Sequence, residues 1–239
     1  IDDSLAEAHG ALGYVTLVYD WDWAGAEREL LRAIELNSGY ASAHQWRGEL
    51  LMGLSQPEEA TKAFMRALDI DPLSIPCNLG LGWSYYFSHN YELAIEQYER
   101  TLEIAPNVPM ALYGLGLSYY HKRLPEQGSA AFQRALTLFG GEAAVVMLMG
   151  VAHAFAGNRP AAEKDLEELR ELSRQKYVPA VYSAFIYAVL DDLDHAFEYL
   201  QKACDERSSY MIFLNVQPSL DNLRPDPRFH DLLKRVGLR

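Results

Sequence analysis

Two histidines at corresponding places in the chain, His9 and His44, are the first residues whose type suggests chemistry. Imidazole nitrogens bind zinc and copper, but such a site needs three or four ligands at a characteristic spacing. The nearest acidic residues, Glu7 and Glu49, do not stand at a spacing that would complete the ligand set. The sequence therefore favours a structural role for both histidines and predicts no metal ion.

Signatures of catalysis are absent from the sequence as well. It has no nucleophile motif, no glycine-rich phosphate loop and no zinc-finger spacing. Gly140-Gly141 comes at the end of a helical stretch, where glycine commonly terminates a helix. The other histidines stand at unrelated positions: His89, His121, His153, His195 and His230. We therefore predict that this chain is not an enzyme and binds no cofactor.

A column of small residues indicates which elements would position a binding site. Its members are Gly13, Gly48, Gly82, Gly116, Gly150 and Ala184, spaced by 35 residues once and by 34 residues four times. Glycine inside a helix costs about 0.5–1 kcal/mol relative to alanine, so a regular series of glycines requires close helix crossings. A 34-residue period is the length of a helix–turn–helix repeat.

Further columns recur later in each unit. One is small: Ala26, Ala60, Ala94, Gly128, Ala162 and Ala196. Four residues after each comes a large apolar residue: Leu30, Phe64, Tyr98, Phe132, Leu166 and Leu200. This spacing places both residues on one face of a helix, and Pro72 and Pro106 end two of the units. Each unit is therefore predicted to contain a second helix whose large residue fills the space between units.

These columns resemble the tetratricopeptide repeat family over roughly residues 4–210. The resemblance implies an all-α fold, a right-handed α-α superhelix of six helix–turn–helix units. We expect the repeats to occupy residues 1–210, at about 6–40, 41–74, 75–108, 109–142, 143–176 and 177–210. The helix pairs are expected at about 5–18/23–36, 41–53/57–70, 75–88/91–104, 109–122/125–138, 143–156/160–173 and 178–190/194–206. The extra residue of the first unit is expected in the turn at residues 21–23.

The expected helix starts also carry capping signals. Ser4 and Ser55 each fit a capping box, with a glutamate three residues later. Asn90 and Asn158 stand where second helices should begin. Arg47 and His153 depart from the family's pattern, because large apolar or aromatic residues stand at the corresponding places in other units.

The last stretch, residues 211–239, breaks the repeat pattern. Asp226-Pro227 reads as an N-cap followed by proline at the first helical position. The apolar stripe of the short helix that follows is Phe229, Leu232, Leu233 and Val236. A stack of repeats needs its terminal apolar face covered, so we predict that residues 211–239 form a C-terminal cap.

Composition limits the classes of function. The 239 residues are 49% hydrophobic, which allows a large core, and the formal net charge of −12 disfavours nucleic-acid binding. No stretch of 18 apolar residues predicts a membrane span. Cys77 and Cys204 fall in different units, and we predict that they form no disulfide, which is consistent with a reducing compartment.

The first helix of most repeat units is expected to carry almost no charge. The stretches 74–87, 110–120, 143–156 and 178–190 contain no Asp, Glu, Lys or Arg, whereas the second helices are rich in charged residues. Since first helices line the concave surface in this family, the resemblance implies an aromatic and nearly uncharged groove. The residues expected to line it are Tyr14, Gln45, Trp46, Glu49, Trp83, Tyr86, Tyr113, Tyr120, His121, Tyr182 and Phe185.

A monomer seldom leaves such an apolar surface bare. We expect a protein or peptide partner to cover it, with aromatic side chains as anchors. The alternatives are a second copy of the chain, or Met211–Leu223 folding back to close a pocket for a small apolar ligand. Family members that grip acidic peptide tails use lysine, arginine and asparagine where this chain has Leu79, Trp83, Tyr113 and Leu117. The side chains that would bind a peptide carboxylate are therefore missing.

The stretches Asp20–Glu27, Tyr40–Trp46 and Asp226–Leu238 also resemble the repeat region of certain bacterial signalling proteins. In those proteins the repeats follow an effector: a nucleotide cyclase, a winged-helix DNA-binding domain or a protein kinase. This second resemblance implies a regulatory module. We expect a fragment whose effector precedes Ile1, and a cytoplasmic location, with an extracytoplasmic one as the alternative if a membrane span precedes Ile1.

Overall fold

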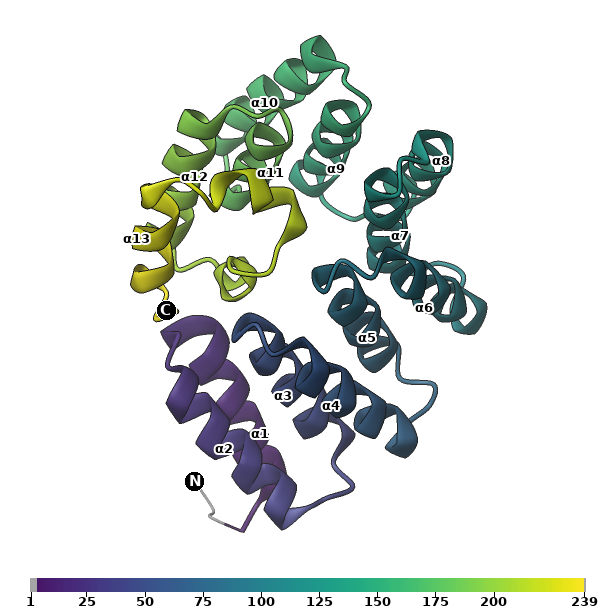
Figure 1. Cartoon of the computed structure of the whole chain (residues 1–239), viewed down its shortest axis with the longest axis vertical. Helices are drawn as coiled ribbons and strands as arrows, with labels where there is room; N and C mark the ends of the chain where they lie inside the picture. Colours follow the sequence, from purple (N-terminus) through teal and green to yellow (C-terminus); the bar gives the residue numbers. More distant parts are fainter. Residues whose placement is uncertain (1–3, 239) are drawn as a thin grey trace.

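The structure is a computed structural model that describes residues 4–238. Ile1, where the expected fragment begins, lies outside the described residues. Within residues 4–238 the chain forms helices and turns and no β-strand. The predicted all-α superhelix is confirmed, because the helices pack in consecutive pairs that follow one another around a curved path (Figure 1).

The helix bounds lie within about three residues of the predicted ranges. The first three pairs are α1 (Ala6–Val15) with α2 (Trp23–Leu36), α3 (Ala41–Gly53) with α4 (Pro57–Ile70), and α5 (Ile75–Phe87) with α6 (Tyr91–Ile104). The next three are α7 (Pro109–His121) with α8 (Pro125–Leu136), α9 (Glu142–Phe155) with α10 (Arg159–Ser173), and α11 (Ala180–Val189) with α12 (Leu193–Asp205). The C-terminal segment contains the 3-10 helices η2 (Ser209–Phe213) and η3 (Pro218–Leu223), then α13 (Pro227–Arg235).

The extra residue of the first unit lies within the first helix and not in the turn at residues 21–23, where the sequence predicted it. Helix α1 continues into the π-helical turn η1 (Thr16–Asp20), and the turn at residues 21–23 follows it. A π-helical turn holds one residue more than an α-helical turn, so it accommodates the longer first spacing within the helix.

Capping was predicted correctly at some helix starts and wrongly at others. Asn158 accepts a hydrogen bond from the backbone N–H of Ala161, at 3.4 Å, and Asp226 accepts one from Arg228, at 2.9 Å. The capping box at Ser55 is wrong, because α4 begins after Gln56 and Ser55 itself has a positive φ of 58°. The capping box at Ser4 is wrong as well, since the N-cap of α1 is Leu5.

The first helix of every repeat is followed by a residue whose backbone lies in the left-handed region. These residues are Trp21, Ser55, His89, Arg123, Gly157 and Asp191, with φ between 57° and 71°. In the last five repeats the next backbone N–H bonds back to a carbonyl five residues earlier, as from Asn90 to Tyr85 at 2.9 Å. This bond is the mark of a Schellman motif, which satisfies carbonyls that the helix end leaves free. The same turn therefore reverses the chain in each of the last five repeats.

The glycine column makes room for aromatic rings of the second helices. The Phe64 ring of α4 lies between Gly48 and Gly80, and the Tyr98 ring of α6 lies between Gly82 and Gly114. Both rings are 0% exposed. Each ring thus inserts between the first helix of its own repeat and that of the next repeat, which joins consecutive repeats.

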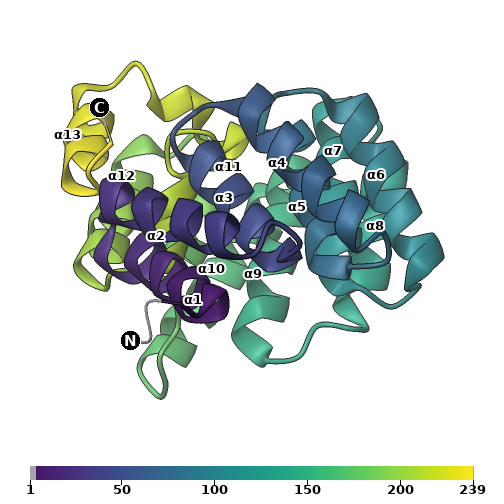
Figure 2. The same ribbon diagram turned by 90° about the horizontal axis from the view of Figure 1, so that it is seen from below.

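The C-terminal segment returns to the first repeat and closes the superhelix into a ring. Figures 1 and 2 both show α13 beside the α1–α2 pair as well as beside α12. The Trp23 indole N–H donates to the carbonyl of Val236 at 2.7 Å. The guanidinium of Arg207 lies 5.1 Å from the Trp21 ring and donates to the carbonyl of Asp20 at 3.2 Å. The sequence did not predict this closure.

Two further sequence predictions can be compared with the described residues. Cys77 and Cys204 are both buried and unpaired with each other, as predicted. Among residues 4–238, every helix is too short or too polar to cross a membrane.

Candidate binding cavity

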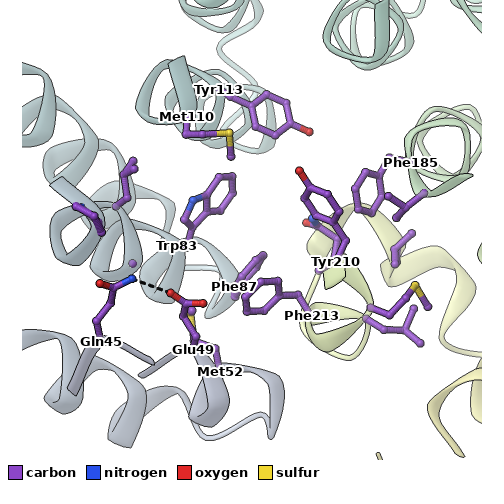
Figure 3. Close-up of a pocket in the computed structure, with 18 of the residues that line it drawn as sticks. Gln45, Glu49, Met52, Trp83, Phe87, Met110, Tyr113, Phe185, Tyr210 and Phe213 are labelled. Carbon is purple, nitrogen blue, oxygen red and sulfur yellow. Dashed lines mark hydrogen bonds between the residues drawn. The ribbon is translucent and has the colours of Figure 1, made fainter. Parts of the chain in front are cut away.

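A cavity of about 420 Å³ lies on the concave side of the ring (Figure 3). First helices of four repeats supply one wall: Tyr14, Gln45, Glu49, Met52, Pro76, Leu79, Gly80, Trp83, Phe87, Met110 and Tyr113. Helices α11 and α12 contribute Val181, Phe185 and Leu200, and the C-terminal segment contributes Tyr210, Met211, Phe213, Leu214, Gln217 and Leu220. The cavity therefore forms only because the segment folds back against the repeats.

Helical spacing explains why these side chains converge. On α3, Gln45, Glu49 and Met52 follow one another at intervals of four and three residues, which places them on one helix face. On α5, Trp83 and Phe87 are four residues apart. Phe87 packs on Phe213 of η2 with ring centroids 5.3 Å apart, and Figure 3 shows this pair beneath Trp83.

Six of the residues expected in the groove line this cavity: Tyr14, Gln45, Glu49, Trp83, Tyr113 and Phe185. Two others, Trp46 and Tyr182, lie beside it. Trp46 stacks on Tyr14 with centroids 5.2 Å apart, and Tyr182 meets Tyr210 edge to face at 6.2 Å.

Three expected groove residues lie in the packing between repeats instead. Tyr86 is fully buried, and its hydroxyl is 3.1 Å from Nε2 of His121. Burial lowers the pKa of His121 to about 4, so this imidazole is neutral at pH 7. Tyr120 stacks between Phe132 and Phe155, with centroids 5.5 and 5.2 Å away.

Sequence reasoning missed part of the lining. Met52, Phe87 and Met110 occupy first helices, and the four-residue spacing from Trp83 to Phe87 was a usable signal. Tyr210 carries no such signal, because it belongs to a short 3-10 helix outside the repeats, whereas Phe213 lies in Met211–Leu223, the segment whose folding back was one of the alternatives.

Glu49 is the only charged residue that lines the cavity within the described part of the chain. Its carboxylate accepts a hydrogen bond from Nε2 of Gln45 at 3.0 Å and interacts with the Tyr14 hydroxyl. Burial raises the pKa of Glu49 to about 6, and the bonds from Gln45 and Tyr14 oppose that rise. Burial, then the Glu49 charge, raises the pKa of Tyr14 to about 12. The carboxylate is therefore ionised at pH 7 in apolar surroundings.

A second polar atom in the lining is unpaired. The Oε1 atom of Gln217 is buried and has no hydrogen-bond partner among residues 4–238. A buried acceptor without a donor is destabilising by roughly 1–3 kcal/mol. The cavity therefore presents apolar side chains, aromatic faces and one anionic carboxylate, while the Gln217 acceptor is closed off from it.

Glu49→Gln is expected to stabilise the fold at high pH. Because the folded pKa of about 6 exceeds the ordinary value of 4.5, the folded state binds more protons between these values, and stability falls as pH rises through this window. The ionised carboxylate thus opposes folding by roughly 1–2 kcal/mol above pH 7. Thermal unfolding at pH 7.5 should show Tm higher by about 2–8 °C in the variant, with the gain shrinking toward pH 4.5.

The matched control for this prediction is Glu59→Gln, on the exposed surface of α4. The pKa of Glu59 is lowered by its hydrogen bond with Lys62, so this variant should show no stabilisation at pH 7.5. The groups that face Glu49 from neighbouring helices, Tyr14 and Cys77, have raised pKa values and do not titrate between pH 4.5 and 7.5. Equal Tm values of Glu49→Gln and the native chain at every pH would contradict the prediction.

Comparisons with known proteins agree with this architecture. Among solved structures, the chain is similar to PilW, a type IV pilus biogenesis factor, with a TM-score of 0.62 and 17% identity over 92% of this chain and 98% of PilW. It is similar to PilF of Pseudomonas aeruginosa, with a TM-score of 0.59 and 17% identity over 92% of this chain and 97% of PilF. A chain of the APC/C hetero-tetramer Cut9–Hcn1 gives a TM-score of 0.65 and 20% identity over 98% of this chain and 43% of that chain.

At such identities these likenesses show the fold alone. A comparison with curated proteins gave no match. The profile of the tetratricopeptide repeat family matches residues 16–75 and 79–143, which is more than half of the chain. Proteins of this kind are typically non-catalytic scaffolds that bind other proteins on a concave surface. The chain belongs to the tetratricopeptide repeat family.

Proposed function

We propose that this chain is a non-catalytic module that binds a partner protein, and that an apolar segment of the partner enters the central cavity. The observation that carries the proposal is the aromatic lining of that cavity. Trp83, Phe87 and Phe213 line it while remaining partly exposed, and Tyr210 is 42% exposed. Aromatic side chains in a concave site supply most of the binding energy in many protein interfaces.

The partner segment must be short. The C-terminal segment already occupies part of the concave side, so a volume of about 420 Å³ remains for a few side chains rather than for a long extended peptide. This geometry favours an anchor of one or two residues, flanked by contacts outside the cavity.

We further propose that the module regulates an effector in a larger bacterial signalling protein in the cytoplasm. The support is the likeness of Asp20–Glu27 and Asp226–Leu238 to such proteins. These two stretches meet where the ring closes, through the bond from Trp23 to Val236.

Trp83→Ala is expected to weaken partner binding by about 30-fold, because a central aromatic anchor contributes about 2 kcal/mol. A random 12-residue peptide library displayed on phage would be selected on the native chain. Affinities of the selected peptides for native and variant chains would then be measured by fluorescence anisotropy. Tyr19→Ala is the control, since Tyr19 is 65% exposed and outside the lining. Selected peptides that bind a folded Trp83→Ala variant as tightly as the native chain would rule out the cavity as the binding site.

A second candidate function is the sensing of a small apolar ligand. Closure of the cavity by residues 210–220 favours it, because the remaining volume falls in the range of about 300–1,000 Å³ common for small-molecule pockets. Such a ligand should raise Tm as its concentration increases. A compound screen without stabilisation, together with peptides that bind through Trp83, would favour the protein partner.

A further inference from the structure

We infer that the central cavity selects a basic side chain, a lysine or arginine of the partner protein, and that Glu49 is its counter-ion. This inference rests on the proposed function, because it names the chemistry of the group that enters the same cavity. It is carried by three observations: an uncompensated carboxylate, aromatic walls and the net charge of the whole chain.

The carboxylate of Glu49 lacks a cationic partner. The described lining residues include no lysine, arginine or histidine. Gln45 and Tyr14 satisfy part of the carboxylate, which has about four acceptor positions in all. A buried anion is unfavourable unless it is paired, so an incoming cation gains more here than a neutral group of the same size.

The walls around Glu49 suit an organic cation. Trp83, Tyr14, Tyr113 and Tyr210 present aromatic rings to the cavity, and Figure 3 shows Trp83 and Tyr210 on opposite sides of it. The face of an aromatic ring attracts an ammonium or guanidinium group within about 6 Å. The aliphatic stem of a lysine or arginine side chain would contact the apolar part of the lining, such as Met110.

The negative net charge of the whole chain also favours a basic partner. A formal net charge of −12 attracts a basic partner over long distances and raises its association rate. A basic segment therefore fits both the surface and the cavity, whereas an acidic segment would be repelled by both.

The test uses the peptides selected on the native chain as described above. Peptides whose binding depends on Trp83 are expected to contain a lysine or arginine beside apolar residues.

Replacing that lysine by norleucine, which keeps the aliphatic stem and removes the charge, should weaken binding of the peptide to the native chain at least tenfold. With the Glu49→Gln variant the same replacement should change affinity less than about threefold. Glu59→Gln should behave like the native chain.

Each other outcome overturns the inference and separates it from the proposed function. Trp83-dependent peptides without basic residues, or norleucine peptides that bind the native chain as tightly, would overturn the cationic anchor and leave partner binding standing. A library that gives no Trp83-dependent peptide would overturn both. If n-butylammonium chloride alone raises the Tm of the native chain but not of Glu49→Gln, while no peptide binds, the cavity takes a free amine and not a partner's side chain.

Discussion

A chain in which valine replaces Gly82 should lose about 3 kcal/mol of its free energy of unfolding. A Cβ atom at Gly82 would lie 2.5 Å from Cε1 of Tyr98. That ring cannot move aside, because Gly114 packs against its other face and Trp83 lies 5.6 Å from it. The collision therefore pushes α5 and α6 apart and weakens the joint between the third and fourth repeats.

The measurement is thermal or urea unfolding followed by circular dichroism, with Tm expected to fall by about 6–12 °C. Gly140→Ala is the matched control, since a Cβ there meets nothing within 4 Å. Combining Gly82→Val with Tyr98→Leu should recover part of the loss, because a smaller side chain leaves room for the methyl groups. A Gly82→Val chain as stable as the native one would show that the repeats do not depend on this close approach.

Trp23→Ala should destabilise the chain by about 3–5 kcal/mol and open the ring. Trp23 is 9% exposed, packs near Gly53 and Gly237, and donates its indole N–H to Val236. The alanine variant loses this packing and leaves the buried carbonyl of Val236 without its donor. Both losses fall at the junction between the first repeat and the C-terminal segment.

Opening of the closed superhelix can be measured separately from the free energy of unfolding. Small-angle X-ray scattering should show a larger radius of gyration for folded Trp23→Ala than for the native chain. Trp23→Phe keeps a six-membered aromatic ring but removes the hydrogen bond and the volume of the pyrrole ring, so we expect a smaller loss, of about 1–3 kcal/mol, and an unchanged radius. A folded Trp23→Ala chain with the native radius would mean that the remaining contacts, such as that of Arg207 with Trp21, close the ring by themselves.

The repeats could be predicted from the sequence because their determinants are local. The spacing from Gly82 to Ala94 and Tyr98 describes contacts between adjacent helices, and the same spacing recurs in each unit. The left-handed turn residues were missed for a physical reason. Only Gly157 among them is a glycine, so the turn is imposed by the helices on either side and not by the residue's own preference.

Closure of the superhelix and formation of the cavity depend on contacts between residues far apart in the sequence, which no local sequence pattern encodes. Closure at Trp23 and Val236 requires the curvature accumulated over six repeats. Glu49 could be predicted as a groove residue, whereas the cavity around it, whose described lining includes no cation, forms only once residues 210–220 pack against the repeats. Tyr210 could not be predicted because a short 3-10 helix has no periodic signal, and the folding back of Met211–Leu223, which includes Phe213, was only one of several alternatives.

Ring closure also sets an order of events during biosynthesis. The hydrogen bond from Trp23 to Val236 joins residues 213 positions apart in the chain. A ribosome adds about 5–20 residues per second, so roughly 10–40 s pass between the synthesis of these two residues. During that time the first repeat can fold, but the surface around Trp21 and Trp23 has no partner to cover it. A chain released before Val236 would leave the ribosome with that apolar surface open to aggregation or to chaperone binding.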